Sequence, residues 1–141
     1  MFIKPSDFLL LVNNLHDFMQ IVPTINAVES DKNGFPVMML SCKLGSINLY
    51  CMHYSSFDEA KSKWEERKTR INYNHLLVIM TDRDGFSEED LKVFEGLSIP
   101  KVLYTSKQRN ICNTVFVKAF RKSENVGIMT DFCVFFGESL L

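Results

Sequence analysis

The stretch Leu76-Leu-Val-Ile-Met-Thr-Asp-Arg-Asp-Gly85 decides the fold of this chain. Five apolar residues follow one another without a break, which is too short a run for a helix and typical of a strand buried on both faces. Strands of this kind belong to parallel sheets, in which helices connect one strand to the next. The stretch therefore predicts an α/β fold built around one buried strand.

The sequence on both sides of this strand alternates between strand and helix patterns. Residues 47–52 and 101–104 are further strand-like runs, and helical patterns separate them from the central strand. The order strand, helix, strand, helix, strand predicts right-handed parallel crossovers. An Asn-Gly turn signal at Gly34 adds a hairpin. We therefore expect a single α/β domain over residues 1–141, with a central mixed, mostly parallel sheet flanked by helices.

The remaining segments add one helix and several strands. Apolar residues recur at helical spacing from Phe8 to Met19, which predicts one helix there. Trp64 lies on the apolar stripe of the helix expected after Ser56, so we expect it to be buried against residues 76–80. Further strands are expected at residues 24–29, 35–43, 114–120 and 133–136.

Composition excludes several classes of protein. The chain has 141 residues, 46% of them hydrophobic, and a net charge of −1. This charge argues against nucleic-acid binding, which needs a basic surface. The run Phe8–Val12 is too short for a signal peptide, and nothing approaches the ~20 apolar residues of a membrane span. We therefore expect a cytoplasmic protein.

The four cysteines do not form a metal or disulfide motif. Cys42, Cys51, Cys112 and Cys133 contain no Cys-x-x-Cys pair, and no histidine stands at zinc-ligand spacing from them. They lie in apolar, strand-like runs. We therefore expect buried, reduced thiols, as in cytosolic proteins.

Polar side chains follow three of the expected strands. They are His53 and Tyr54 after the first strand, Asp82, Arg83 and Asp84 after the second, and Thr105, Ser106 and Lys107 after the third. Ligands of parallel sheets bind at the carboxyl ends of the strands. If the three strands are neighbours, these groups share one edge of the sheet and form one site.

The residue types at this edge suggest roles. Asp82-x-Asp84 matches a pattern in which two carboxylates hold Mg²⁺ or Mn²⁺ against a diphosphate, as in many nucleotide-sugar transferases. Asp82 and His53 are the candidate catalytic groups, because imidazole titrates near neutral pH. The alternative is structural: the aspartates cap a turn in which Gly85 supplies the unusual φ, and His53 is a hydrogen-bonded residue at a strand end.

The other polar residues at this edge are candidate ligand contacts. Tyr54, Arg83 and Lys107 are expected to bind substrate, with Arg83 or Lys107 holding phosphate charge. No dinucleotide, phosphate-loop or hydrolase motif is present. The sequence leaves open whether the protein is an enzyme.

Two longer segments resemble a known family. They are Phe2-Ile-Lys-Pro-Ser-Asp-Phe8, and His53–Gly85 with its pattern HY…EA…W…RK.RIN…L.VIMTDRDG. Together they resemble DUF1919, a family of uncharacterised bacterial proteins labelled exopolysaccharide biosynthesis proteins. Members carry a further segment before the position of Phe2, and residues 130–141 do not match well. The chain is therefore expected to be a short or N-terminally truncated member.

The resemblance implies a role in making exopolysaccharide or capsular polysaccharide. The first expectation is a cytosolic protein that binds a sugar nucleotide, or transfers its sugar. The second is a non-catalytic interaction partner of the polysaccharide-assembly proteins. The length of 141 residues favours the second, because complete nucleotide-sugar transferase domains are generally larger.

Overall fold

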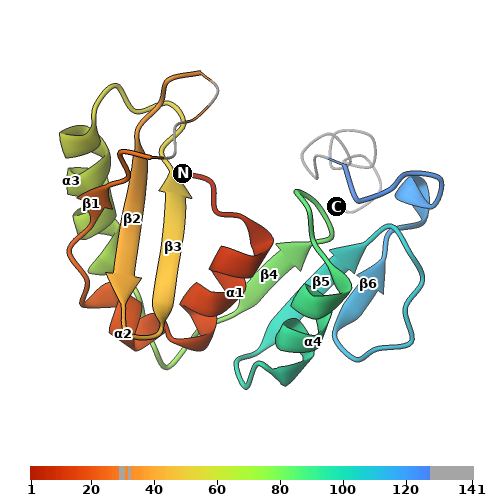
Figure 1. Ribbon diagram of the computed structural model, residues 1–141. Coiled ribbons are helices and arrows are strands. Elements are labelled where there is room, and N and C mark those ends of the chain that lie inside the picture. The colour runs from red at the N-terminus through yellow and green to blue at the C-terminus, as the bar shows by residue number, and fades with distance from the viewer. Residues whose placement is uncertain (29–30, 32, 128–141) are drawn as a thin grey trace, which may run out of the picture. The chain divides into compact units, whose positions relative to one another are not determined.

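The computed structural model describes residues 1–28, 31 and 33–127 and divides into two compact units, Met1–His75 and Leu76–Leu141 (Figure 1). The described strands form two three-stranded sheets, and one of them is parallel. The protein is therefore α/β, as predicted. The single central sheet is not confirmed.

The described residues of the first unit form an antiparallel sheet and three helices. Its elements are α1 (Pro5–Asn13), α2 (Leu15–Met19), β1 (Thr24–Ile25), β2 (Val37–Cys42), β3 (Gly45–Tyr50) and α3 (Phe57–Lys68). The strand order is β1-β2-β3, and Val37 pairs with Tyr50 in the hairpin. Phe18, Met38 and Leu49 are fully buried in its core.

The helix expected over residues 8–19 is broken at Asn14. Its backbone has φ −130° and ψ 38°, which is outside the helical region. The Asn14 side chain donates to the carbonyl of Leu10 at 3.1 Å. Asparagine side chains compete for backbone hydrogen bonds in this way, which explains the break.

Strand β3 does not belong to the parallel set that the sequence predicted. One of its edges pairs with β2. On the other edge, Phe2 and Tyr50 exchange two backbone hydrogen bonds of 2.8 Å, and the Asp7 carboxylate accepts from the Asn48 backbone N–H at 2.9 Å. Because both edges are occupied, β3 offers no edge for a parallel neighbour.

Trp64 also departs from its predicted surroundings. It is half-buried and packs against the core of the first unit. The reason is that α3 packs against β2 of the antiparallel sheet. The helix therefore contributes to the core of its own unit.

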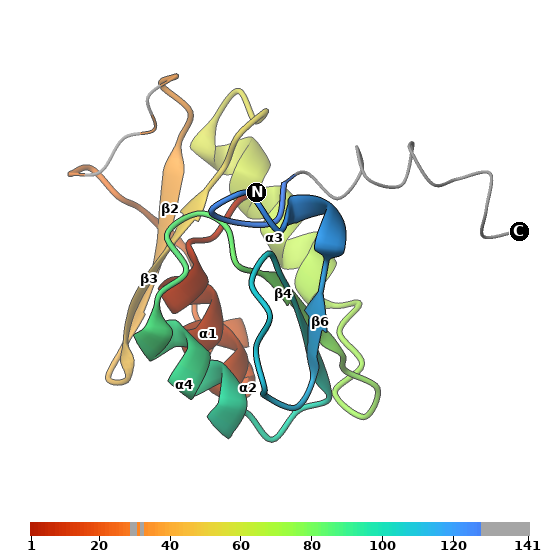
Figure 2. The same ribbon diagram turned by 90° about the vertical axis from the view of Figure 1, so that its right-hand side faces the viewer.

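The second unit contains the parallel sheet. Its elements are β4 (Val78–Thr81), α4 (Glu88–Gly96), β5 (Lys101–Thr105), β6 (Thr114–Phe116) and the 3₁₀ turn η1 (Lys118–Phe120). The order is β4-β5-β6, and both strand pairs are parallel. The predicted crossover from β4 through α4 to β5 is confirmed. Figure 2 shows α4 on one side of this sheet.

The two faces of the parallel sheet differ in exposure. Met80 and Leu103 pair on one face and are buried, as is Phe94 of α4. Side chains alternate between faces along a strand. Ile79 and Val115 lie on the other face, where they are 57% and 43% exposed. The prediction that strand β4 is buried on both faces is therefore wrong, because α4 packs on one face and Ile79 on the other face is exposed.

The cysteines only partly follow the prediction. All three described cysteines are free thiols: Cys51 is buried, Cys42 is half-buried and Cys112 is exposed. Cys112 lies in the loop between β5 and β6 rather than in a strand, which explains its exposure. Cys133 and the strand predicted at residues 133–136 lie outside the described residues.

The start of α4 provides a test of the second unit's stability. The Ser87 hydroxyl accepts from the Asp90 backbone N–H at 3.1 Å, and the Asp90 carboxylate accepts from the Ser87 backbone N–H at 2.9 Å. We expect Ser87→Ala and Asp90→Ala each to lower the free energy of unfolding by about 1 kcal/mol. The double variant should lose less than the sum, because the two groups act as one unit. Urea denaturation measures these losses.

The control is Ser98→Ala, at an exposed site beyond the other end of α4, which should change the free energy of unfolding little. Strict additivity of the two losses in the double variant would contradict the capping box.

Candidate functional site

The candidate site begins at the carboxyl end of β4 with a tight turn. The Phe86 backbone N–H donates to the Arg83 carbonyl at 3.1 Å. Between them, Asp84 and Gly85 have φ values of 58° and 86°, the signature of a type I′ turn. Asp84 is exposed, and aspartate tolerates this left-handed region better than most residues. The turn therefore follows the structural alternative that the sequence offered for Gly85.

The Asp82 carboxylate is the centre of the site. Its Oδ2 lies 2.8 Å from the Ser106 backbone nitrogen, 2.9 Å from the Ser106 hydroxyl and 3.1 Å from the Thr105 hydroxyl. Its Oδ1 accepts from the Val126 backbone N–H at 2.6 Å. Asp82 is half-buried, and its three partners are buried. One carboxylate thus joins the ends of β4 and β5 to the segment at Val126.

These contacts limit what Asp82 can do chemically. Backbone N–H groups are held in direction, so those of Ser106 and Val126 both remain aimed at the carboxylate. Each hydroxyl has one proton and a second acceptor nearby, the Lys107 carbonyl for Thr105 and the Glu124 carbonyl for Ser106. Both carboxylate oxygens of Asp82 nevertheless have N–H donors that a cation would have to displace. The observed arrangement suits a positioning group.

A metal site at Asp82 and Asp84 stays a prediction. In the described part of the chain, no cluster of three or more histidine, cysteine, aspartate or glutamate side chains could hold a metal ion. Asp84 is exposed in the turn, whereas Asp82 is engaged by β5. The geometry therefore weighs against a shared cation.

Two cationic side chains lie at the same edge. Arg83 follows Asp82 directly, and Lys107 follows Ser106, whose backbone is bonded to Asp82. Within residues 1–28, 31 and 33–127, neither forms an ion pair. Arg83 is half-buried and Lys107 is exposed. Neither cation is thus held in a short ion pair among these residues, although the Lys107 charge also helps to lower the pKa of Glu88.

A further arginine, which the sequence did not single out, holds the loop after β5. Arg109 binds Glu88 in a two-pronged ion pair, with nitrogen–oxygen distances of 2.9 and 3.0 Å. The Arg109 side chain is 14% exposed. Its hydrogen bonds, and then its charge, hold the pKa of the Glu88 carboxyl below its usual value. No local sequence pattern connects two residues that are 21 positions apart.

His53 and Tyr54 belong to the first unit. They follow β3, where the Tyr54 backbone N–H closes a turn onto the Cys51 carbonyl at 3.1 Å. His53 is exposed, has φ 74°, and its ring lies 6.0 Å from the ring of Phe35. The sequence placed His53 and Tyr54 at the same sheet edge as Asp82 because it assigned β3 to the parallel sheet. Since β3 is not a strand of that sheet, this reason for a shared site no longer holds. The roles predicted for His53 and Tyr54 stay predictions.

Comparison with known proteins identifies a family and a relative. A family model described as "Domain of unknown function (DUF1919)" matches residues 1–141, including the tail that the sequence had placed outside the resemblance. A Haemophilus influenzae protein, named only as an uncharacterized protein, is 34% identical over 134 residues. That match covers 94% of this chain and 62% of the relative. No helix in the described ranges is long and apolar enough to cross a membrane.

Removing the Asp82 charge tests its positioning role. Asp82→Asn replaces an acceptor by an amide nitrogen that faces N–H donors. We expect the free energy of unfolding to fall by about 1–3 kcal/mol, the cost of leaving buried donors unsatisfied. Asp84→Asn is the matched control, because asparagine also tolerates the left-handed turn, and it should change stability by less than about 0.5 kcal/mol. Urea denaturation measures both, and equal effects would contradict the assignment.

The Glu88–Arg109 pair predicts a pH dependence. Because the folded-state pKa of Glu88 is lowered, its stabilising effect is present above the usual value of about 4.3 and is lost as pH falls through the folded pKa. Wild type should therefore be more stable than Glu88→Gln at pH 7, and the difference should vanish in acid. Thermal melts across pH measure this. Glu89→Gln, in the same helical turn, controls for the helix dipole. A pH-independent difference would contradict the assignment.

Proposed function

The chain belongs to the DUF1919 family, and on that premise we propose that it is a cytoplasmic protein of surface-polysaccharide assembly that binds a sugar nucleotide at the carboxyl edge of its parallel sheet. The carrying observation is the pair of cations, Arg83 and Lys107, beside the Asp82 network. Cationic side chains bind phosphate oxygens through charge-assisted hydrogen bonds. The position agrees with the general rule that ligands bind where parallel strands end.

In the proposed complex, different residues bind the ligand and hold the site together. Arg83 and Lys107 hold the diphosphate, and the Asp82 network keeps the segments that carry them together. The exposed Asp84 turn forms the rim. In this proposal Asp82 is a positioning residue, and metal binding by Asp82 and Asp84 is the competing arrangement.

A second candidate function is a non-catalytic partner of the polysaccharide-assembly proteins. One specific observation favours it: Ile79 and Val115 are exposed on one face of the parallel sheet. Parallel sheets are usually covered on both faces, and exposed apolar patches often mark protein contacts. Absence of any nucleotide binding would favour this candidate.

Calorimetric titration with UDP-, GDP- and CMP-sugars tests the first proposal. We expect Arg83→Gln and Lys107→Gln each to weaken binding by at least about tenfold, because one charge-assisted hydrogen bond contributes about 1.5 kcal/mol. Lys92→Gln, which removes an exposed lysine from the helix α4, is the matched control and should bind like wild type.

The same titrations separate the two arrangements of the site. With and without Mn²⁺, we expect similar affinity if the cationic side chains bind the diphosphate. Binding that requires Mn²⁺ and is lost in Asp84→Asn would instead support the metal arrangement. Failure of every sugar nucleotide to bind the folded wild-type protein would overturn the proposal.

A further inference from the structure

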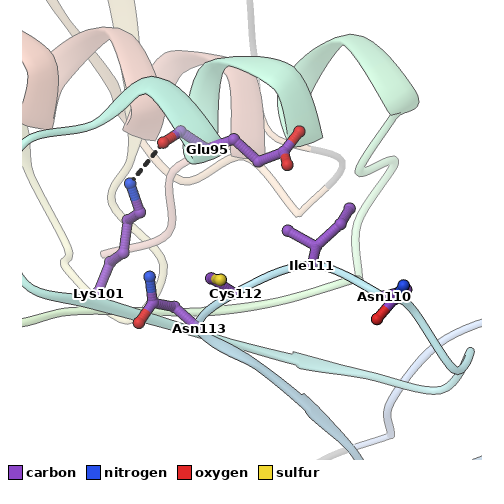
Figure 3. A pocket seen from close by; sticks show the side chains of 6 residues that line it. All are labelled: Glu95, Lys101, Asn110, Ile111, Cys112 and Asn113. Carbon is purple, nitrogen blue, oxygen red and sulfur yellow. Dashed lines mark hydrogen bonds between the residues drawn. The ribbon is translucent and has the colours of Figure 1, made fainter.

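A cavity lies at the opposite end of the parallel sheet from the Asp82 network. Its volume is about 260 Å³, and it is partly open to solvent. Its walls come from the end of α4, the start of β5 and the segment before β6, as Figure 3 shows. The lining residues are Glu95, Lys101, Asn110, Ile111, Cys112 and Asn113. All six belong to the second unit.

Hydrogen bonds fix these walls in place. The Lys101 ammonium donates to the carbonyl oxygens of Glu95, at 2.7 Å, and of Leu97, which anchors it to the end of α4 (Figure 3). The Asn113 carbonyl accepts from the Leu103 backbone N–H at 2.9 Å, and the Thr114 hydroxyl donates to the Ile111 carbonyl at 2.8 Å. These hydrogen bonds hold together the end of α4, the start of β5 and the segment before β6, which surround the cavity.

The lining groups are polar but balanced in charge. Glu95 supplies one carboxylate and Lys101 one ammonium, so the cavity carries no net charge. The amides of Asn110 and Asn113 each offer two donors and one acceptor oxygen. Ile111 adds an apolar surface. A phosphate or a dicarboxylate would gain little here, whereas a ligand with several hydroxyl groups matches both the donors and the acceptors.

We propose that this cavity binds an uncharged, hydroxyl-rich small molecule of the size of a single sugar ring. Drug-sized ligands occupy pockets of roughly 300–1,000 Å³, so this cavity takes a smaller molecule. The Asn110 and Asn113 amides and the Glu95 carboxylate bind its hydroxyl groups, and Ile111 packs against its carbon atoms. This cavity is separate from the proposed nucleotide site, because the two lie at opposite ends of β5.

Cys112 provides a reporter inside the cavity. Its thiol is exposed, whereas Cys51 is buried, and burial raises the pKa of the Cys51 thiol. A molecule in the cavity would cover the Cys112 thiol and slow its alkylation by iodoacetamide. The intact folded chain is alkylated and then digested, and mass spectrometry of the peptides follows Cys112 separately from the other cysteines.

The experiment measures protection of Cys112 by D-glucose, D-galactose, D-mannose and N-acetyl-D-glucosamine at millimolar concentrations. At least one of them should slow alkylation with a saturable dependence on its concentration. D-Glucuronate and glucose 6-phosphate should protect less well than their neutral counterparts.

Asn113→Gly tests the contact directly, with calorimetry as a second readout. Asn113 has φ 62°, which glycine adopts easily, so this variant removes the amide without straining the backbone. Its affinity should fall by about tenfold, the equivalent of one hydrogen bond of about 1.4 kcal/mol. Gln108→Ala, at an exposed site in the same loop but outside the lining, should bind like wild type. If Asn113→Gly loses its native circular dichroism, Asn110→Ala replaces it in this comparison.

Three results would overturn the proposal. They are no protection by any neutral sugar, stronger protection by the charged sugars, and unchanged affinity in the folded amide variant. The outcome is independent of nucleotide binding at the carboxyl edge, since Arg83→Gln and Lys107→Gln leave this cavity intact.

Discussion

The Asp82 carboxylate is the contact on which the carboxyl edge of the parallel sheet depends. Parallel strands all end at the same edge of the sheet, where the hydrogen bonds between strands stop. Beyond this edge the chain continues from each strand as a separate segment, which needs other contacts to hold it in place. Asp82 joins three such segments through partners that stand 23, 24 and 44 residues away in the sequence. A half-buried carboxylate needs its oxygens satisfied, and here the chain itself supplies the donors.

Two other features of this edge follow from that contact. Lys107 is placed by the hydrogen bonds of its neighbours Thr105 and Ser106, and Arg83 by the turn that begins directly after Asp82. The Arg109–Glu88 ion pair adds a second link, between the loop after β5 and the start of α4. These contacts link the segments of an edge that carries two cations without ion-pair partners among the described residues.

The sequence predicted those elements whose signals are local. The unbroken apolar run predicted β4, and the helical pattern between this strand and residues 101–104 predicted α4. The partners of β3 could not be predicted in the same way. They depend on Phe2 and Asp7, which stand more than forty residues earlier in the chain and occupy its outer edge. A strand pattern shows that a segment is extended, but it does not show which edge will accept it.

The same distinction applies to the candidate site. Its place after β4 followed from the pattern of the strand, and the Asp84–Gly85 turn followed from turn chemistry. The role of Asp82 in joining three segments could not be predicted, because its hydrogen-bond donors come from distant segments and two of them are backbone groups. Arg109 was missed for the same reason, and the exposed Cys112 because its apolar neighbours suggested a strand.

A parallel sheet also separates the chemistry of its two ends. Because all three strands point the same way, every connection that leaves a strand lies at one end, and every connection that enters a strand lies at the other. Here the leaving connections carry Arg83 and Lys107, whereas the entering connections contribute Lys101, balanced by Glu95, together with two amides. The charged ligand and the neutral ligand that we propose would thus bind separate ends of a sheet with three described strands. The two surfaces are separated by the length of β5. The hydrogen bonds of Asp82 hold together the segments that carry Arg83 and Lys107 at the charged end.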